Sequence, residues 1–127
     1  MVQTENPEAD MKKLITALML LPLPAWADDP VIEAVRTQQS GSGWSVSVTL
    51  LHPDSGWDHY ADGWEVLDAN GNSLGHRVLA HPHVNEQPFT RSLSGISIPT
   101  GTNKVFVRAH CLLDGWGDHR FEVLLEN

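Results

Sequence analysis

The sequence predicts an all-β protein, an immunoglobulin-like antiparallel sandwich of about seven strands. Short runs alternate between apolar and polar residues, as half-buried strands do. Turn residues separate these runs at intervals of roughly 8 to 12 residues, which is the spacing of a sandwich. No window has the periodicity of an amphipathic helix.

Seven segments carry the strand pattern. Residues 44–50 alternate Trp, Val, Val and Leu with Ser and Thr, and residues 105–109 alternate Val, Val and Ala with Phe and Arg. Asn70-Gly71 is a hairpin turn signal between two further runs, and Gly/Ser at 40–43 and Pro-Thr-Gly-Thr at 99–102 separate others. In chain order we expect strands at 31–36, 44–50, 64–67, 74–79, 89–98, 105–109 and 121–125.

A signal peptide is predicted ahead of these strands. Residues 11–13 are Met-Lys-Lys, residues 14–21 form an apolar run, and Ala-Trp-Ala at 25–27 has the small-x-small pattern of a cleavage site. The apolar run is much shorter than the ~20 residues that cross a bilayer as a permanent helix. We therefore expect a Sec-type signal peptide over 11–27.

This assignment divides the chain into three parts. The acidic residues within 1–10 precede the basic start, so we expect Met11 to begin translation and 1–10 to be a mis-called or disordered leader. Residues 28–127 are expected to form one periplasmic or secreted domain, with no membrane span after cleavage. The formal net charge of the chain is −8, which argues against nucleic acid or anionic lipid as a partner and favours cations.

Metal-binding side chains follow the apolar faces of two strands. The inward series of 44–50 continues in register to His52, and that of 105–109 continues to Cys111, the single cysteine of the chain. The second and sixth strands of an immunoglobulin-like sandwich face one another. We therefore expect His52 and Cys111 to meet at one end of the core.

Other residues could complete a metal site there. Two segments share a pattern of His, a short acidic loop, Gly-Trp, and Asp followed by His, at 52–59 and 110–119. A further pair of histidines two residues apart points the same way in an extended chain. Imidazole and thiolate donors suit Fe, Cu, Zn or Ni, and nearby carboxylates can orient the imidazoles. The candidate ligands are His52, His59, Cys111, Asp114, His110, His119, His81 and His83.

The segment 52–71 also resembles a known family. It reads His52-Pro53, then His59-Tyr60, Trp64-Glu65-Val66 and Asn70-Gly71, and Cys111 with Gly115 follows. This order is similar to the iron-binding domain of desulfoferrodoxin and neelaredoxin, the superoxide reductases. The resemblance implies an immunoglobulin-like fold and an iron held by several His and one Cys, with one position open to superoxide.

Carried over by position, the resemblance assigns ligand roles to His52, His59 and Cys111. The ligand set is incomplete, because Asp114 stands where the family has its last histidine and no histidine precedes Trp44.

Two functions follow from these observations. The first is an exported metal-binding protein with a mononuclear His/Cys site, Fe or Cu favoured over Zn or Ni, that resembles a superoxide reductase and meets a small oxidant. The second is a non-catalytic periplasmic interaction or carrier-companion domain, which binds a protein partner through its Trp/His loops and in which Cys111 is merely buried. Motifs of hydrolytic enzymes are absent from the sequence.

Overall fold

The structure is a computed structural model that describes residues 29–126. The leader expected at 1–10 and the signal peptide expected at 11–27 lie outside the described residues. Within 29–126, no helix is long and apolar enough to cross a membrane.

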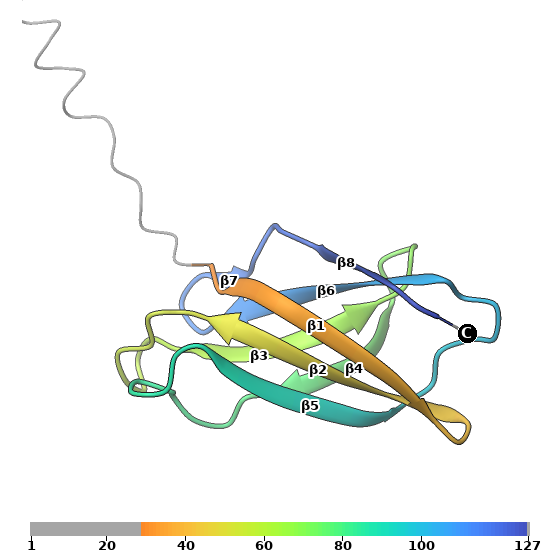
Figure 1. The fold of residues 1–127 in the computed structure, drawn as a ribbon. Coiled ribbons are helices and arrows are strands. Elements are labelled where there is room, and N and C mark those ends of the chain that lie inside the picture. The colour runs from red at the N-terminus through yellow and green to blue at the C-terminus, as the bar shows by residue number, and fades with distance from the viewer. Residues whose placement is uncertain (1–28, 127) are drawn as a thin grey trace, which may run out of the picture.

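Two antiparallel sheets pack face to face and enclose the core (Figure 1). The first sheet has the order β1-β2-β5, and the second has the order β4-β3-β6-β7, with β8 also paired to β6. The strands are β1 (Val31–Ser40), β2 (Gly43–Leu51), β3 (Ala61–Leu67), β4 (Ser73–Val78), β5 (Phe89–Ile96), β6 (Lys104–Cys111), β7 (Gly115–Trp116) and β8 (Phe121–Leu124).

The all-β sandwich predicted from the sequence is confirmed, with eight strands rather than about seven. The additional strand, β7, has two residues, too few for a period-two pattern to show. β1 is longer than expected, because its polar end at 37–40 pairs with the first residues of β2 across a tight turn. This end is largely exposed at a sheet edge, so no apolar alternation marks it.

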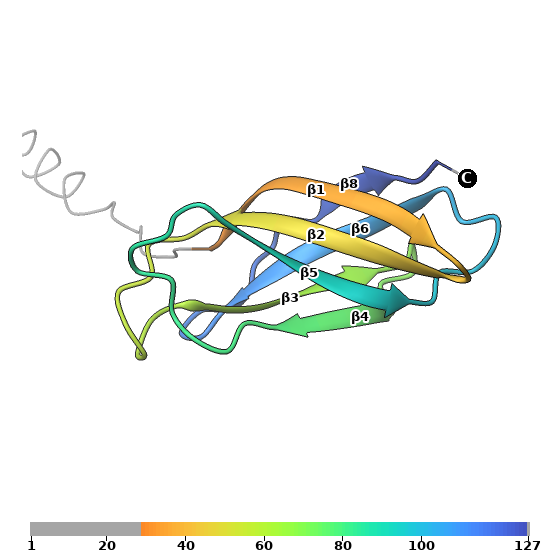
Figure 2. The same ribbon diagram turned by 60° about the horizontal axis from the view of Figure 1, so that its bottom comes forward.

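The core lies between the inner faces of β2 and β6. Val46, Val48 and Leu50 of β2 are at most 1% exposed, and Val105 and Val107 of β6 are fully buried. Because side chains alternate between the two faces of a strand, each series continues to a buried polar residue where its strand ends. Both strands run toward the same end of the sandwich (Figure 2), and the candidate site lies there.

The hairpin between β3 and β4 is closed by Asp68. Its Oδ1 accepts hydrogen bonds from the backbone N–H groups of Asn70 and Asn72, both at 2.9 Å. Gly71 adopts φ 87°, a left-handed conformation that glycine reaches at no steric cost. The hydrogen bond from the Asn72 backbone, aided by that from Asn70, lowers the pKa of the Asp68 carboxyl.

We expect Leu50→Ala to lower the free energy of unfolding by about 2–5 kcal/mol, because it opens a cavity between the sheets. Leu124→Ala is the matched control: Leu124 is 68% exposed, and surface substitutions usually stay within about 0.5 kcal/mol. Chemical denaturation measures both variants. Equal losses would contradict the placement of Leu50 in the core.

The Asp68 carboxylate should contribute stability that depends on pH. Its pKa is lowered on folding, so the stabilisation is present above the unfolded-state pKa of about 3.9 and is lost as pH falls through the folded value. Asp68→Ala should therefore reduce stability at pH 7 and make little difference at about pH 2. NMR titration of the Asp68 carboxyl gives the folded pKa directly, and an ordinary value would contradict the turn geometry.

Candidate metal centre

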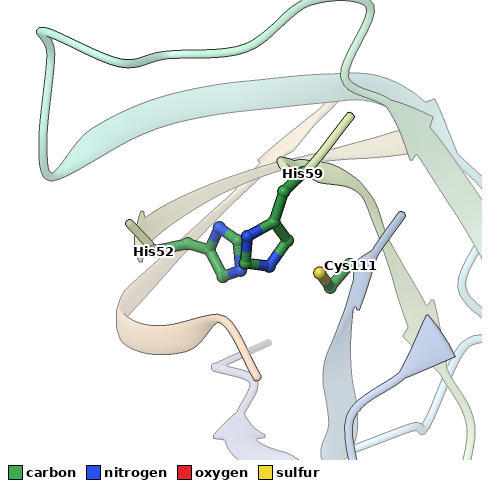
Figure 3. Close-up of side chains that lie close together, drawn as sticks. All are labelled: His52, His59 and Cys111. Carbon is green, nitrogen blue, oxygen red and sulfur yellow. The ribbon is translucent and has the colours of Figure 1, made fainter. Parts of the chain in front are cut away.

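Three metal-binding side chains converge at one end of the sandwich. The ligand atoms of His52, His59 and Cys111 all lie within 4.8 Å of one another, and Figure 3 shows the two imidazoles and the thiol gathered in one place. His52 and Cys111 are fully buried, and His59 is half-buried. The cluster thus belongs to the core at its inner side and approaches solvent through His59.

Opposite sheets supply two of the three residues. His52 directly follows β2 in the first sheet, and Cys111 is the last residue of β6 in the second. Cys111 is held on its strand by pairing with Ala61 of β3 and Gly115 of β7. The expectation that His52 and Cys111 meet at one end of the core is therefore confirmed by their position.

A tight turn returns His59 to the same place. The His59 N–H donates to the Gly56 carbonyl at 3.1 Å, and the Ser55 N–H donates to the His59 carbonyl at 3.0 Å. The His59 ring then meets the His52 ring edge-on, with centroids 5.0 Å apart. The eight-residue segment 52–59 thus brings its two imidazoles into contact.

The Cys111 sulfur is buried beside the two imidazoles and the loop that carries Asp114. Burial raises the pKa of its thiol, and hydrogen bonds from the backbone N–H groups of Asp114 and Leu113 oppose this rise only in part. Without a cation, Cys111 is therefore a neutral thiol near neutral pH. A bound metal ion would reverse this preference, because coordination deprotonates a thiol.

The buried carboxylate of Asp54 connects the cluster to its surroundings. Its Oδ1 accepts from His52 Nδ1 at 2.6 Å and from the Ala61 N–H at 3.0 Å, and its Oδ2 accepts from the His83 N–H at 2.8 Å. The Asp54 side chain is fully buried. One carboxylate thus joins the end of β2, the start of β3 and the loop that follows β4.

Asp54 also selects the tautomer of His52. A carboxylate can only accept, so the proton of the neutral imidazole lies on Nδ1 and the lone pair on Nε2. Within residues 29–126, nothing hydrogen-bonds to the buried His52 Nε2. A buried acceptor without a hydrogen bond costs about 1–3 kcal/mol, and a metal ligated by Nε2 would remove that cost.

The donor set fits a transition metal. Two imidazoles and a thiolate are ligands of Zn, Cu or Fe rather than of Mg or Ca, and Asp54 gives the carboxylate–histidine pair common behind metal ligands. Metal–nitrogen and metal–sulfur bonds are about 2.0–2.3 Å long. The three donors, now within 4.8 Å, would need to approach slightly to bind one ion.

The structure places the other candidate ligands outside this cluster. His110 lies on the outer face of β6, where its Nδ1 pairs with Asp62 and its ring meets Trp116. The strand alternation that turns Cys111 inward turns His110 outward, so the likeness between 52–59 and 110–119 does not extend to side-chain direction. His119 is exposed. Asp114 is exposed too, but it stays next to the cluster, because its backbone N–H and its carboxylate both form hydrogen bonds with the Cys111 thiol.

His81 and His83 also lie apart from the three ligands. His81 is exposed, whereas His83 is 5% exposed and stacks on Phe89 with ring centroids 3.9 Å apart. Burial, together with the charge of Arg91, lowers the pKa of the His83 imidazole. His83 is linked to the cluster through Asp54, by its backbone rather than its ring.

Sequence reasoning did not single out two residues of the site, Asp54 and Gln87. The Gln87 Oε1 accepts from the His52 N–H at 2.9 Å, and its Nε2 donates to the His83 carbonyl at 2.9 Å. In the sequence both residues read as ordinary polar loop positions. The one available signal is the placement of Asp54 two residues after a predicted ligand, which is compatible with a carboxylate behind an imidazole.

Comparison with known proteins gives partial relatives. No protein-family model matches the chain. Over 93 residues the chain is 45% identical to a protein of Halomicrobium mukohataei named "Putative lipoprotein"; the match covers 72% of this chain and 45% of that protein. The chain thus spans less than half the length of that relative.

Two solved structures align with the chain. A hypothetical protein of Pyrococcus horikoshii OT3, PH1083, aligns with a TM-score of 0.50 and 18% identity, covering 87% of this chain and 99% of that one. A superoxide reductase in the oxidised state aligns with a TM-score of 0.46 and 22% identity, covering 78% of this chain and 88% of that one. At this identity the first likeness concerns the fold alone.

Asp54→Asn should weaken the network even without metal, because an amide cannot accept all three hydrogen bonds. Hydrogen bonds to a charged group are worth about 1.5–3 kcal/mol, and we expect a loss of that order in the free energy of unfolding. The His83 amide should also exchange faster with deuterium. Asp58→Asn is the matched control, since it removes the same charge from an exposed position of the same loop. Equal effects of the two substitutions would contradict the role of Asp54.

Proposed function

We propose that this chain is an exported metal-binding protein with a mononuclear site formed by His52, His59 and Cys111. The observation that carries the proposal is the convergence of two imidazoles and a thiol, within 4.8 Å, where both sheets end. Iron or copper is the favoured metal, with zinc or nickel as the alternatives.

The chemistry of the donors supports a redox role. A bound metal would supply an electron-accepting or Lewis-acidic centre, and the Cys111 thiolate would tune its potential. Three protein ligands leave at least one coordination position open. The resemblance of 52–71 to superoxide reductases favours a small oxidant such as superoxide at that position.

The residues of the chain would each have a separate task. His52 presents Nε2 because Asp54 holds the proton on Nδ1. The sandwich core shields His52 and Cys111 from water, while His59 lies on the side nearer to solvent. Exclusion of water strengthens the interaction of the thiolate with a cation.

Export is supported by two independent observations. The basic start, apolar run and Ala-Trp-Ala pattern of residues 11–27 are those of a signal peptide. The relative from Halomicrobium mukohataei is named as a lipoprotein, a class of exported proteins. We therefore place the domain in the periplasm or outside the cell.

A second function, protein binding, is favoured by exposed apolar side chains around the same end. Trp57 is 68% exposed, and Leu113 is 66% exposed in the loop that follows Cys111. The Leu112 N–H donates to the Tyr60 carbonyl, which brings the two loops together. Exposed tryptophans of this kind are common anchors for protein partners. Loss of a partner in Trp57→Ala, in a protein that binds no metal, would favour this function over the first.

Cys111→Ser should remove the thiolate-to-metal charge-transfer band from the iron- or copper-loaded protein. The band can be assigned without ambiguity, because the chain has a single cysteine. Metal affinity should fall by at least about 10-fold, because mutation of a residue that only hydrogen-bonds to a metal ligand already costs about that much. Absorption and paramagnetic resonance spectra, with metal analysis of untagged protein, measure both effects.

His119→Ala is the control for this experiment, because His119 is an exposed histidine outside the cluster. It should leave the band and the affinity unchanged. The proposal fails if the wild-type chain retains no stoichiometric metal after reconstitution with Fe, Cu, Zn and Ni. It also fails in its ligand assignment if the band survives in Cys111→Ser.

A further inference from the structure

His83 is a buried imidazole whose two ring nitrogens have no hydrogen-bond partner within residues 29–126. Native proteins satisfy nearly all buried polar groups, and each exception calls for an explanation such as an ion. A buried donor or acceptor that is left without a hydrogen bond costs about 1–3 kcal/mol. The ring of His83 therefore has coordination capacity that the protein itself does not use.

The position of His83 is firmly determined. Its N–H donates to Asp54 Oδ2 at 2.8 Å, and its carbonyl accepts from Gln87 Nε2 at 2.9 Å. Its ring lies nearly parallel to that of Phe89, at an angle of 12°. Hydrogen bonds thus fix both the N–H and the carbonyl of His83, and Phe89 fixes one face of its ring. The two ring nitrogens are therefore held in a defined position although they have no hydrogen-bond partner within residues 29–126.

A second imidazole lies beside it. The rings of His81 and His83 have centroids 4.7 Å apart. The His81 Nδ1 lies 3.1 Å from the Pro82 carbonyl, which can only accept, so in the neutral ring the proton lies on Nδ1 and the lone pair on Nε2. His81 thus offers a nitrogen ready to bind a metal.

The spacing of the rings fits coordination of one ion. With metal–nitrogen bonds of about 2.0–2.1 Å, two imidazoles on the same ion have ring centroids about 5 Å apart. The His52 and His59 rings, which belong to the first cluster, have centroids 5.0 Å apart. The 4.7 Å between His81 and His83 is therefore as suitable as the spacing in the first cluster.

The two residues line an open hollow of about 520 Å³ on the molecular surface, together with Trp57 and Glu86. The Glu86 carboxylate, which pairs with Arg91 at 3.1 Å, adds negative charge at the rim. A hydrated cation can thus reach the exposed His81 ring from this hollow and keep water in its remaining positions. The ring nitrogens of His83 are themselves buried, so a small rotation of the two rings must accompany binding.

We propose that His81 and His83 form a second transition-metal site, separate from His52, His59 and Cys111. It would take a borderline divalent cation such as Zn²⁺, Ni²⁺ or Cu²⁺, for which neutral imidazole is a good ligand. This site lacks a thiolate and is open to water, so it should bind more weakly than the first and exchange its metal with solution. The inference does not depend on the function proposed for the first cluster.

Zinc titration of the full chain and of His81→Ala tests the proposal. His81 is exposed, so its replacement should leave the fold intact, which thermal unfolding verifies. The wild-type chain should bind two Zn²⁺, and His81→Ala should lose the weaker event, seen in calorimetry. In NMR spectra of ¹⁵N-labelled wild-type protein, the ring nitrogens of His81 and His83 should shift on zinc addition, and those of His83 should no longer shift in His81→Ala.

Two further variants make the outcome specific. His119→Ala, another exposed histidine, should keep both binding events. Cys111→Ala should lose or weaken the tighter event and keep the weaker one. If the function proposed for the first cluster is wrong but this inference holds, wild type binds one Zn²⁺ and His81→Ala binds none. An unchanged weaker event in His81→Ala, or ring nitrogens of His83 that do not shift in wild type, would overturn the inference.

Discussion

The buried carboxylate of Asp54 is the interaction on which this end of the molecule depends. It accepts hydrogen bonds from the His52 ring, the Ala61 backbone and the His83 backbone, and these come from three separate segments. In a low-dielectric interior such bonds are strong when complete, and an unmet charge there is costly. The positions of the end of β2, the start of β3 and the loop after β4 therefore depend on one another through Asp54.

The core determines where this carboxylate can act. His52 turns inward because it continues the face of Val46, Val48 and Leu50, and Cys111 does so because it continues the face of β6. A slip of one residue in either strand would turn its ligand to the other face, and it would also expose the whole apolar series. The same burial that stabilises the sandwich thus sets the register of the site.

Local pattern was sufficient to predict every strand except the two-residue β7, the sandwich, and the meeting of His52 with Cys111, since these follow from period-two alternation and strand order. It was not sufficient for Asp54 and His83, which lie in irregular loops. Their burial arises from contacts between residues 29 positions apart in the sequence. The alternation of apolar and polar residues within one segment cannot predict such contacts. It also misled for His110, because a motif likeness carries no information on which face of a strand a residue occupies.

Two side chains, Asp54 and Gln87, each bind both His52 and His83. Asp54 joins the His52 ring to the His83 N–H, and Gln87 joins the His52 N–H to the His83 carbonyl. A shift of the His83 backbone therefore strains the same bonds that orient His52, and the reverse holds equally. Any free-energy coupling between ligands at the two histidines is reciprocal by thermodynamic necessity. The hydrogen bonds of Asp54 and Gln87, rather than the sheets, are thus the contacts through which a metal ion at one histidine would change the metal affinity of the other.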